Sequence, residues 1–140
     1  MEMNKFVHDV IKENGTNDPF IIAENNDISY LYNEDFDESF HAIFLNLRNN
    51  PTIIINGKYK YSPEKYFYMA HELLHALYHH ETIAFYHNAT HEKAKNEHEA
   101  NQFATLLLLS DQQVEEGMTY EELLRINYIP VEMIDLIGGN

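Results

Sequence analysis

The sequence predicts an α+β fold in which a small antiparallel sheet of about three strands packs on a helical core. Three short runs rich in β-forming residues are grouped between residues 28 and 55, and apolar residues recur at helical intervals on both sides of them. With 140 residues and a hydrophobic fraction of 44%, the chain is long enough to bury one core but short for two. We therefore expect a single domain over residues 1–140.

Two short helices are expected before the sheet. Residues 4–14 carry apolar side chains at helical intervals, and Gly15 follows them as a typical stop signal. Asp18-Pro19 can open a second helix, and the polar run at residues 25–27 predicts the turn that ends it.

The three expected strands are residues 28–32, 41–45 and 52–55. The last is the clearest, because it carries three isoleucines between Pro51 and an Asn-Gly pair. Since connections are short, an antiparallel sheet of about three strands is the economical arrangement.

A strong helix should follow the sheet. Ser62 is a good N-cap, Pro63 suits the first helical position, and the helix is expected to run to about His79 or His80. Its expected core stripe comprises Tyr66, Met69 or Ala70, Leu73 and Leu77.

Three more helices are expected toward the C-terminus. A long one should span about residues 92–109, and residues 119–122 form a capping box for a short one. Pro130 should open the last helix, which is expected to stop at residues 138–139.

The charge and cysteine content exclude several function classes. The formal net charge is −14, which disfavours direct binding of nucleic acid and would suit a basic partner. The chain contains no cysteine, so disulfide scaffolds, thiolate metal sites and a cysteine nucleophile are excluded.

The sequence shows no sign of a membrane or a secretory route. No stretch approaches the ~18 consecutive apolar residues of a membrane span, and residues 1–10 lack the apolar segment of a signal peptide. We therefore expect a cytoplasmic protein that does not bind membranes.

The motif His71-Glu72-Leu73-Leu74-His75 carries the chemistry. Two histidines four residues apart on a helix lie on one face, where both imidazoles can grip one tetrahedral ion. Glu72 lies toward the same side, where it can act as a general base for an attacking water. The pattern indicates a zinc peptidase, although solvent-exposed His and Glu on a helix surface would give the same letters.

A catalytic zinc site needs a third protein ligand, which we expect on the long helix of residues 92–109. Glu97 leads, because it shares a face with small residues that allow close helix approach, while Glu99 and His98 are the second and third candidates. Asn101, four residues after Glu97, can accept a hydrogen bond from a motif imidazole.

The remaining histidines are not expected to bind the ion. His79 is interpreted as a helix C-terminal residue that interacts with the helix dipole, although its position four residues after His75 leaves a metal-facing role open. His80, His87 and His91 are expected in solvent or in the linker, and the roles of His8 and His41 stay open.

The two motifs together resemble the ImmA/IrrE family of metallopeptidases. The likeness rests on His71-Glu-Leu-Leu-His75-Ala-Leu and on Glu97-x-Glu-Ala-Asn101-x-Phe-Ala104-x-x-Leu-Leu, and the elements around them fit most of the chain. The chain has Leu109-Ser110 where family members often place a proline, which affects the exit of that helix and not the metal site.

The resemblance implies a zinc-dependent fold of the gluzincin type. Its Zn²⁺ ligands match His71, His75 and an acid best placed at Glu97, and Glu72 would be the general base. The family is common in phages and mobile elements, and it includes anti-repressors that cleave a helix-turn-helix transcriptional repressor. Such a repressor is therefore the expected protein partner and substrate, and no extra DNA-binding domain is expected within these 140 residues.

Two readings compete with a regulatory endopeptidase. The domain could be a non-catalytic, zinc-stabilised module that binds a protein, or a protease-type toxin held by a partner. For the peptidase, the substrate is expected to pair with a sheet edge, either residues 41–45 or residues 52–55. The candidates for a transition-state donor are Tyr59, Tyr61, His41 and Tyr86.

Overall fold

The computed structural model describes residues 1–79 and 90–137, with the side chains of residues 90–92 left aside. The predicted α+β class is confirmed. Along the described chain, two helices precede the three strands of one sheet, and the remaining helices follow them. The helices are α1 (Met3–Asn14), α2 (Pro19–Asn25), α3 (Lys65–Leu74), α4 (Thr90–Leu109) and α5 (Tyr120–Ile126), and the strands are β1 (Ser29–Asn33), β2 (Ala42–Leu47) and β3 (Asn50–Asn56). Shorter helical turns are η1 (Gly57–Tyr59), η2 (His75–His79) and η4 (Val131–Leu136).

The sheet is mixed rather than antiparallel, which corrects the expectation from the sequence. The strand order is β1-β3-β2, with β3 antiparallel to β2 but parallel to β1. The tight β2–β3 hairpin turns at Arg48 and Asn49, which both have positive φ as a two-residue hairpin loop requires. The most apolar run therefore becomes the central strand, which is covered on both edges.

The loop of residues 34–41 explains the parallel pairing. It leaves the end of β1, crosses the end of β3 and enters β2 on the far side, so that β1 and β2 never pair. The Asn56 side chain holds this loop by donating hydrogen bonds to the backbone carbonyls of Asp37 and Phe40. A side chain at Gly57 would collide with Glu34, so the loop also needs the glycine there.

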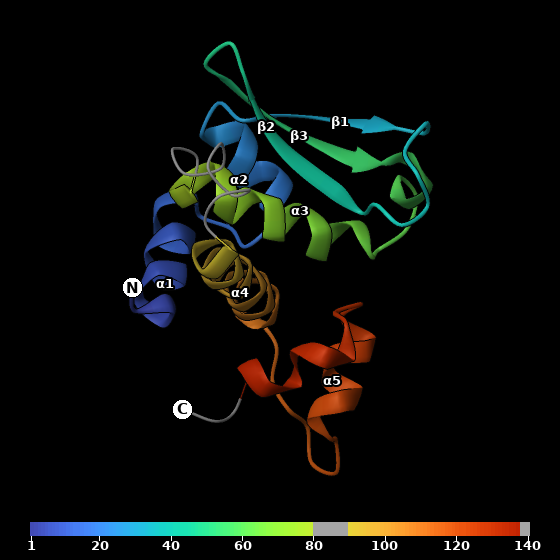
Figure 1. The fold of residues 1–140 in the computed structure, drawn as a ribbon. Coiled ribbons are helices and arrows are strands. Elements are labelled where there is room, and N and C mark those ends of the chain that lie inside the picture. The colour runs from blue at the N-terminus through green and yellow to red at the C-terminus, as the bar shows by residue number, and fades with distance from the viewer. Residues whose placement is uncertain (80–89, 138–140) are drawn as a thin grey trace.

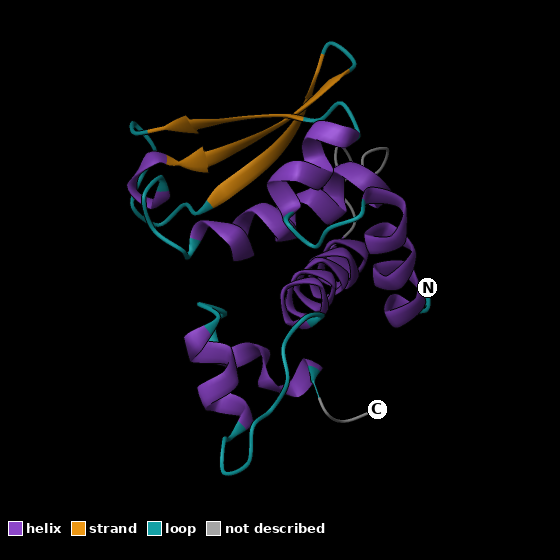
Figure 2. Ribbon diagram, turned by 180° about the vertical axis from the view of Figure 1, so that it is seen from behind, coloured by secondary structure: helices purple, strands orange, loops and turns teal. Residues whose placement is uncertain are grey.

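Helix α3 lies between two layers. Figures 1 and 2 show the sheet on one side of α3 and α4 crossing on the other, with α1 beside α4. The predicted stripe is confirmed at Met69, Ala70 and Leu73, which are fully buried, while Tyr66 is exposed. The side chains of α4 that complete this core are Ala100, Phe103, Ala104 and Leu107.

Local capping follows the sequence at most helix ends. Gly15 ends α1 with a left-handed φ of 70°, and Asp18 caps α2 by accepting a hydrogen bond from the backbone N–H of Phe20. The capping box of α5 forms, since Thr119 accepts from the backbone N–H of Glu122. Helix α3 begins later than expected, because Ser62 caps only a turn by accepting from the N–H of Glu64.

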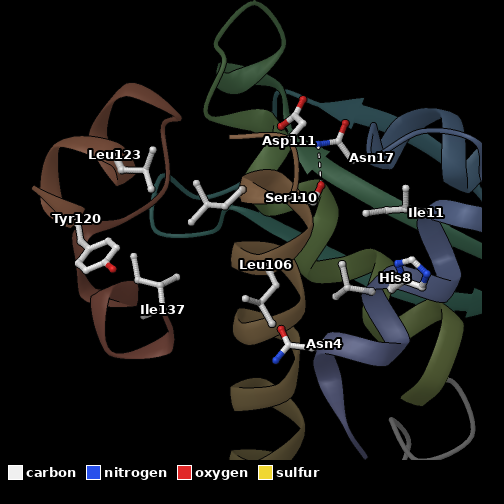
Figure 3. Close-up of a pocket in the computed structure, with 12 residues that line it drawn as sticks. Asn4, His8, Ile11, Asn17, Leu106, Ser110, Asp111, Tyr120, Leu123 and Ile137 are labelled. Carbon is white, nitrogen blue, oxygen red and sulfur yellow. Dashed lines mark hydrogen bonds between the residues drawn. The ribbon is translucent and has the colours of Figure 1, made fainter. Parts of the chain in front are cut away.

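The C-terminal elements α5 and η4 pack against each other, and η4 packs on α4. The C-terminal residues line parts of two separate pockets. Pro130 precedes the 3₁₀ turn η4 rather than an α-helix, and the expected stop at residues 138–139 falls outside the described residues. A cavity of about 640 Å³ lies between α1, the end of α4, α5 and Ile137, and beside it Asn17 donates a hydrogen bond to Ser110 (Figure 3). None of its lining residues lines the cleft described below.

No helix within residues 1–79 and 90–137 is both long and apolar enough to cross a membrane.

Candidate metal centre

Helix α3 and the turn η2 present the two motif histidines to α4. His71 lies in the last turn of α3, and His75 opens η2 four residues later, so both imidazoles project from one side. The His71 side chain is 13% exposed and that of His75 is 2% exposed. Glu97 projects from the second turn of the part of α4 whose side chains are described, with its carboxylate 42% exposed.

The Glu97 carboxylate bridges the two imidazoles. His71 Nε2 lies 3.0 Å from Glu97 Oε2, and His75 Nε2 lies 2.8 Å from Glu97 Oε1. All three donor groups fall within 4.8 Å of one another, so the trio could hold a metal ion. Ligands at zinc-bond lengths on a tetrahedron lie roughly 3.3 Å apart, so the side chains need to separate only slightly from their present hydrogen bonds to surround an ion.

Charges within the trio favour an ionised carboxylate. Burial acts to raise the pKa of Glu97, but hydrogen bonds and positive charge from His71 and His75 outweigh it and hold that pKa well below its usual range. Burial acts to lower the pKa of His71, yet Glu97 and Glu72 raise it overall. A carboxylate that stays ionised is the form that binds a cation.

Glu72 lies beside the trio without belonging to it. Its carboxylate is 3.7 Å from His71 Nε2 and lines a cleft of about 520 Å³ that also borders His71 and Glu97. Burial raises the pKa of Glu72 to about 7, against the opposing effects of His71 and of a hydrogen bond from the Phe44 backbone. A carboxylate with such a pKa can both accept and return a proton near neutrality.

Each motif imidazole also has a partner on its other nitrogen. Asn101 accepts from His71 Nδ1 at 2.8 Å, as the sequence indicated. His75 Nδ1 lies 3.0 Å from His79 Nδ1, and His79 Nε2 lies 2.9 Å from Glu99 Oε1. His79 therefore ends the turn η2, as expected, and in addition contacts the candidate ligand His75, which the sequence had left open.

The other two candidates for third ligand lie away from the trio. His98 is exposed, and Glu99 contacts His79 with a side chain that is only 14% exposed. The sequence signal for His79 is the repeated four-residue spacing of His71, His75 and His79. His80 and His87 lie outside the described residues, as does the side chain of His91.

The cleft wall opposite α4 holds an aromatic cluster. The His41 ring lines the cleft, stacks on Tyr68 at 4.3 Å between centroids, and accepts or donates a hydrogen bond of 2.7 Å between Nδ1 and the Tyr59 hydroxyl. Tyr68 was missed from the sequence, while Tyr61 is 91% exposed and does not line the cleft. Tyr86 lies outside the described residues, and His8 lines the other cavity.

Most of the chain, including every residue of the candidate site, matches one known protein family. Residues 23–128 match the family model Peptidase_M78, described as the IrrE N-terminal-like domain. No curated protein and no solved structure matches the chain.

Proposed function

Because the chain belongs to the Peptidase_M78 family, whose members are metallopeptidases of the ImmA/IrrE type, we propose that it is a zinc-dependent endopeptidase. In this proposal His71, His75 and Glu97 hold the metal and Glu72 is the general base. One observation carries it: His71 and Glu97 line a cleft of about 520 Å³ together with Glu72, and His75 contacts the same Glu97 carboxylate from its buried side. The match also supports the resemblance to that family noted from the sequence.

The donor set suits zinc. Two imidazole nitrogens and one carboxylate are the ligands of many catalytic zinc sites, and three protein ligands leave one position open toward the substrate. When bound, zinc supplies Lewis-acid polarisation of the scissile carbonyl and of the attacking water. The protein groups contribute by holding the ion at the cleft floor, because the trio spans α3, η2 and α4.

Glu72 performs the proton transfers. It sits next to His71 and is oriented by the Phe44 backbone N–H, so its carboxylate has a fixed place at the cleft floor. There it accepts the proton of the attacking water and passes it to the leaving amine. A purely structural metal site has no use for such a base, which disfavours a non-catalytic binding module.

The substrate is expected to lie along β2. This strand pairs only with β3 in the described part of the chain, whereas residues 52–55 lie in the central strand and cannot offer an edge. The Asn56 N–H bonds to the His41 carbonyl, so the alternation of an antiparallel ladder turns the main-chain groups of Ala42 and Phe44 away from β3. An extended peptide added there would pass over Glu72.

His41 is the best-placed candidate for the transition-state donor. Burial and the nearby Lys58 lower the pKa of His41, so its imidazole is neutral at neutral pH. Burial and a hydrogen bond to Tyr59 raise the pKa of Tyr68, which keeps that phenol protonated as a donor to Tyr59. Tyr59 then donates to His41 Nδ1, which leaves the ring proton on Nε2 for a developing oxyanion.

Replacing His41 with Phe should lower kcat about 100-fold with a smaller change in KM, because the donor acts only in the transition state. Tyr59→Phe should show a weaker fall, since it frees the tautomer of His41. Zinc content should stay unchanged in both variants. His8→Phe, in the other cavity, is the matched control and should keep full activity. An unaltered kcat in His41→Phe would remove His41 from the mechanism.

The proposed substrate is a helix-turn-helix transcriptional repressor, in which case the protein is an anti-repressor of a phage or mobile element. The support is the family resemblance together with the net charge of −14, which suits a basic, DNA-binding partner. The test is to incubate the zinc-loaded protein with the repressor encoded beside its gene and to sequence the new N-terminus. A repressor left intact by a zinc-loaded enzyme would exclude this substrate, and a purified protein without metal would refute the zinc peptidase itself.

A further inference from the structure

We propose that His79 and Glu99 are positioning residues that set the tautomer and orientation of His75 through a chain of two hydrogen bonds. The inference rests on the proposed function, because it assigns these residues a role toward the metal ligand His75. His79 and Glu99 neither bind the metal nor transfer a proton in this proposal.

A continuous line of contacts begins at Glu97 on α4, passes through two histidines of η2 and ends at Glu99 on α4. Glu97 Oε1 lies 2.8 Å from His75 Nε2, His75 Nδ1 lies 3.0 Å from His79 Nδ1, and His79 Nε2 lies 2.9 Å from Glu99 Oε1. His75 and His79 are 2% and 3% exposed, and Glu99 is 14% exposed. Buried polar groups are costly unless they are hydrogen-bonded, and this line gives each ring nitrogen a partner.

The donor and acceptor of each hydrogen bond in this line follow from the requirement that His75 binds a metal ion. His75 must offer the Nε2 lone pair to a metal ion, so its proton resides on Nδ1 and is donated to His79 Nδ1. His79 then carries its own proton on Nε2, which it donates to the Glu99 carboxylate. With an ion at His75 Nε2, each neutral imidazole thus has one proton and every group of the line has a partner. Without the ion, His75 Nε2 donates to the Glu97 carboxylate instead.

The backbone brings His79 into this place. Helix α3 passes into the π-helical turn η2 at His75, and this wider turn keeps His75 and His79 together on the buried side. The second candidate ligand, His71, has a different partner, because its Nδ1 donates a hydrogen bond to the neutral amide of Asn101. The Glu99 carboxylate acts on His75 through the His79 ring, so the pair should raise the basicity of His75 as a ligand.

The test is zinc affinity, measured by competition with a chromogenic chelator, in the wild type and in four variants. His79→Ala should weaken zinc binding 10- to 100-fold, the range that loss of an outer partner typically causes. His79→Gln should restore part of it, because the amide can accept from His75 and donate to Glu99. Glu99→Gln should show a smaller loss, since it keeps an acceptor but removes the charge.

Met69→Ala is the matched control for a merely structural role. Met69 is fully buried on α3 and does not line the cleft, so its truncation should lower the melting temperature of the apoprotein and leave zinc affinity unchanged. The visible spectrum of the cobalt-loaded protein gives a second readout, which should change in His79→Ala and not in Met69→Ala.

The outcomes separate this inference from the proposed function. If His79→Ala lost stability as Met69→Ala does but kept wild-type zinc affinity and the wild-type cobalt spectrum, the positioning role would be wrong and the peptidase would stand. If the wild-type protein bound no zinc, both proposals would fall together.

Discussion

Glu72→Gln should abolish peptide cleavage while the protein keeps its metal. The substitution preserves the size of the side chain and its place beside His71, but an amide cannot accept the proton of the attacking water. Loss of a general base typically costs 10²- to 10⁴-fold in rate, so kcat should fall by about 1,000-fold or more. The measurements are the rate of substrate cleavage and the zinc content by mass spectrometry.

The control for this variant is Glu64→Gln, which changes an exposed carboxylate at the start of the same helix. It should retain wild-type cleavage and wild-type zinc. A Glu72→Gln protein that still relieved repression in cells would show that binding, and not proteolysis, is the function. Growth arrest caused by expressing the wild type without its neighbouring genes, and prevented by the same substitution, would favour the reading as a toxin.

Local patterns predicted the elements of this fold better than their pairing. The run at residues 52–55 was legible as a strand, and the spacing of His71 and His75 placed both on one face, because each depends on a short periodicity. The sheet order was missed because it depends on the loop of residues 34–41, which reaches across β3 and is held there by Asn56.

The residues of the candidate site also differ in how far local patterns predicted them. Helical spacing favoured Glu97 as the third ligand and Asn101 as its neighbour, and in the structure both side chains contact His71. The His79–Glu99 contact was missed although His79 repeats the four-residue spacing of His71 and His75, because His79 was interpreted as a residue at a helix end. Tyr68 was missed because its role comes from stacking on His41, which lies 27 positions earlier in the chain and reaches it only through the fold.

Glu97→Ala should remove tight zinc binding, and with it all activity. The substitution deletes the carboxylate that meets both His71 and His75, and it leaves two imidazoles, which are too few for a catalytic zinc site. The loss of affinity should exceed the ~100-fold that is the upper end for outer partners of a ligand.

His98→Ala is the matched control, since His98 neighbours Glu97 on α4 but is exposed. A ligand that binds only the folded state stabilises it by about 4 kcal/mol at 1,000 times its Kd. Added zinc should therefore raise the melting temperature of the wild type and of His98→Ala, but not that of Glu97→Ala. If His98→Ala lost the zinc-dependent shift and Glu97→Ala kept it, the third ligand would be assigned wrongly, and α4 would have to turn to bring His98 to the cleft.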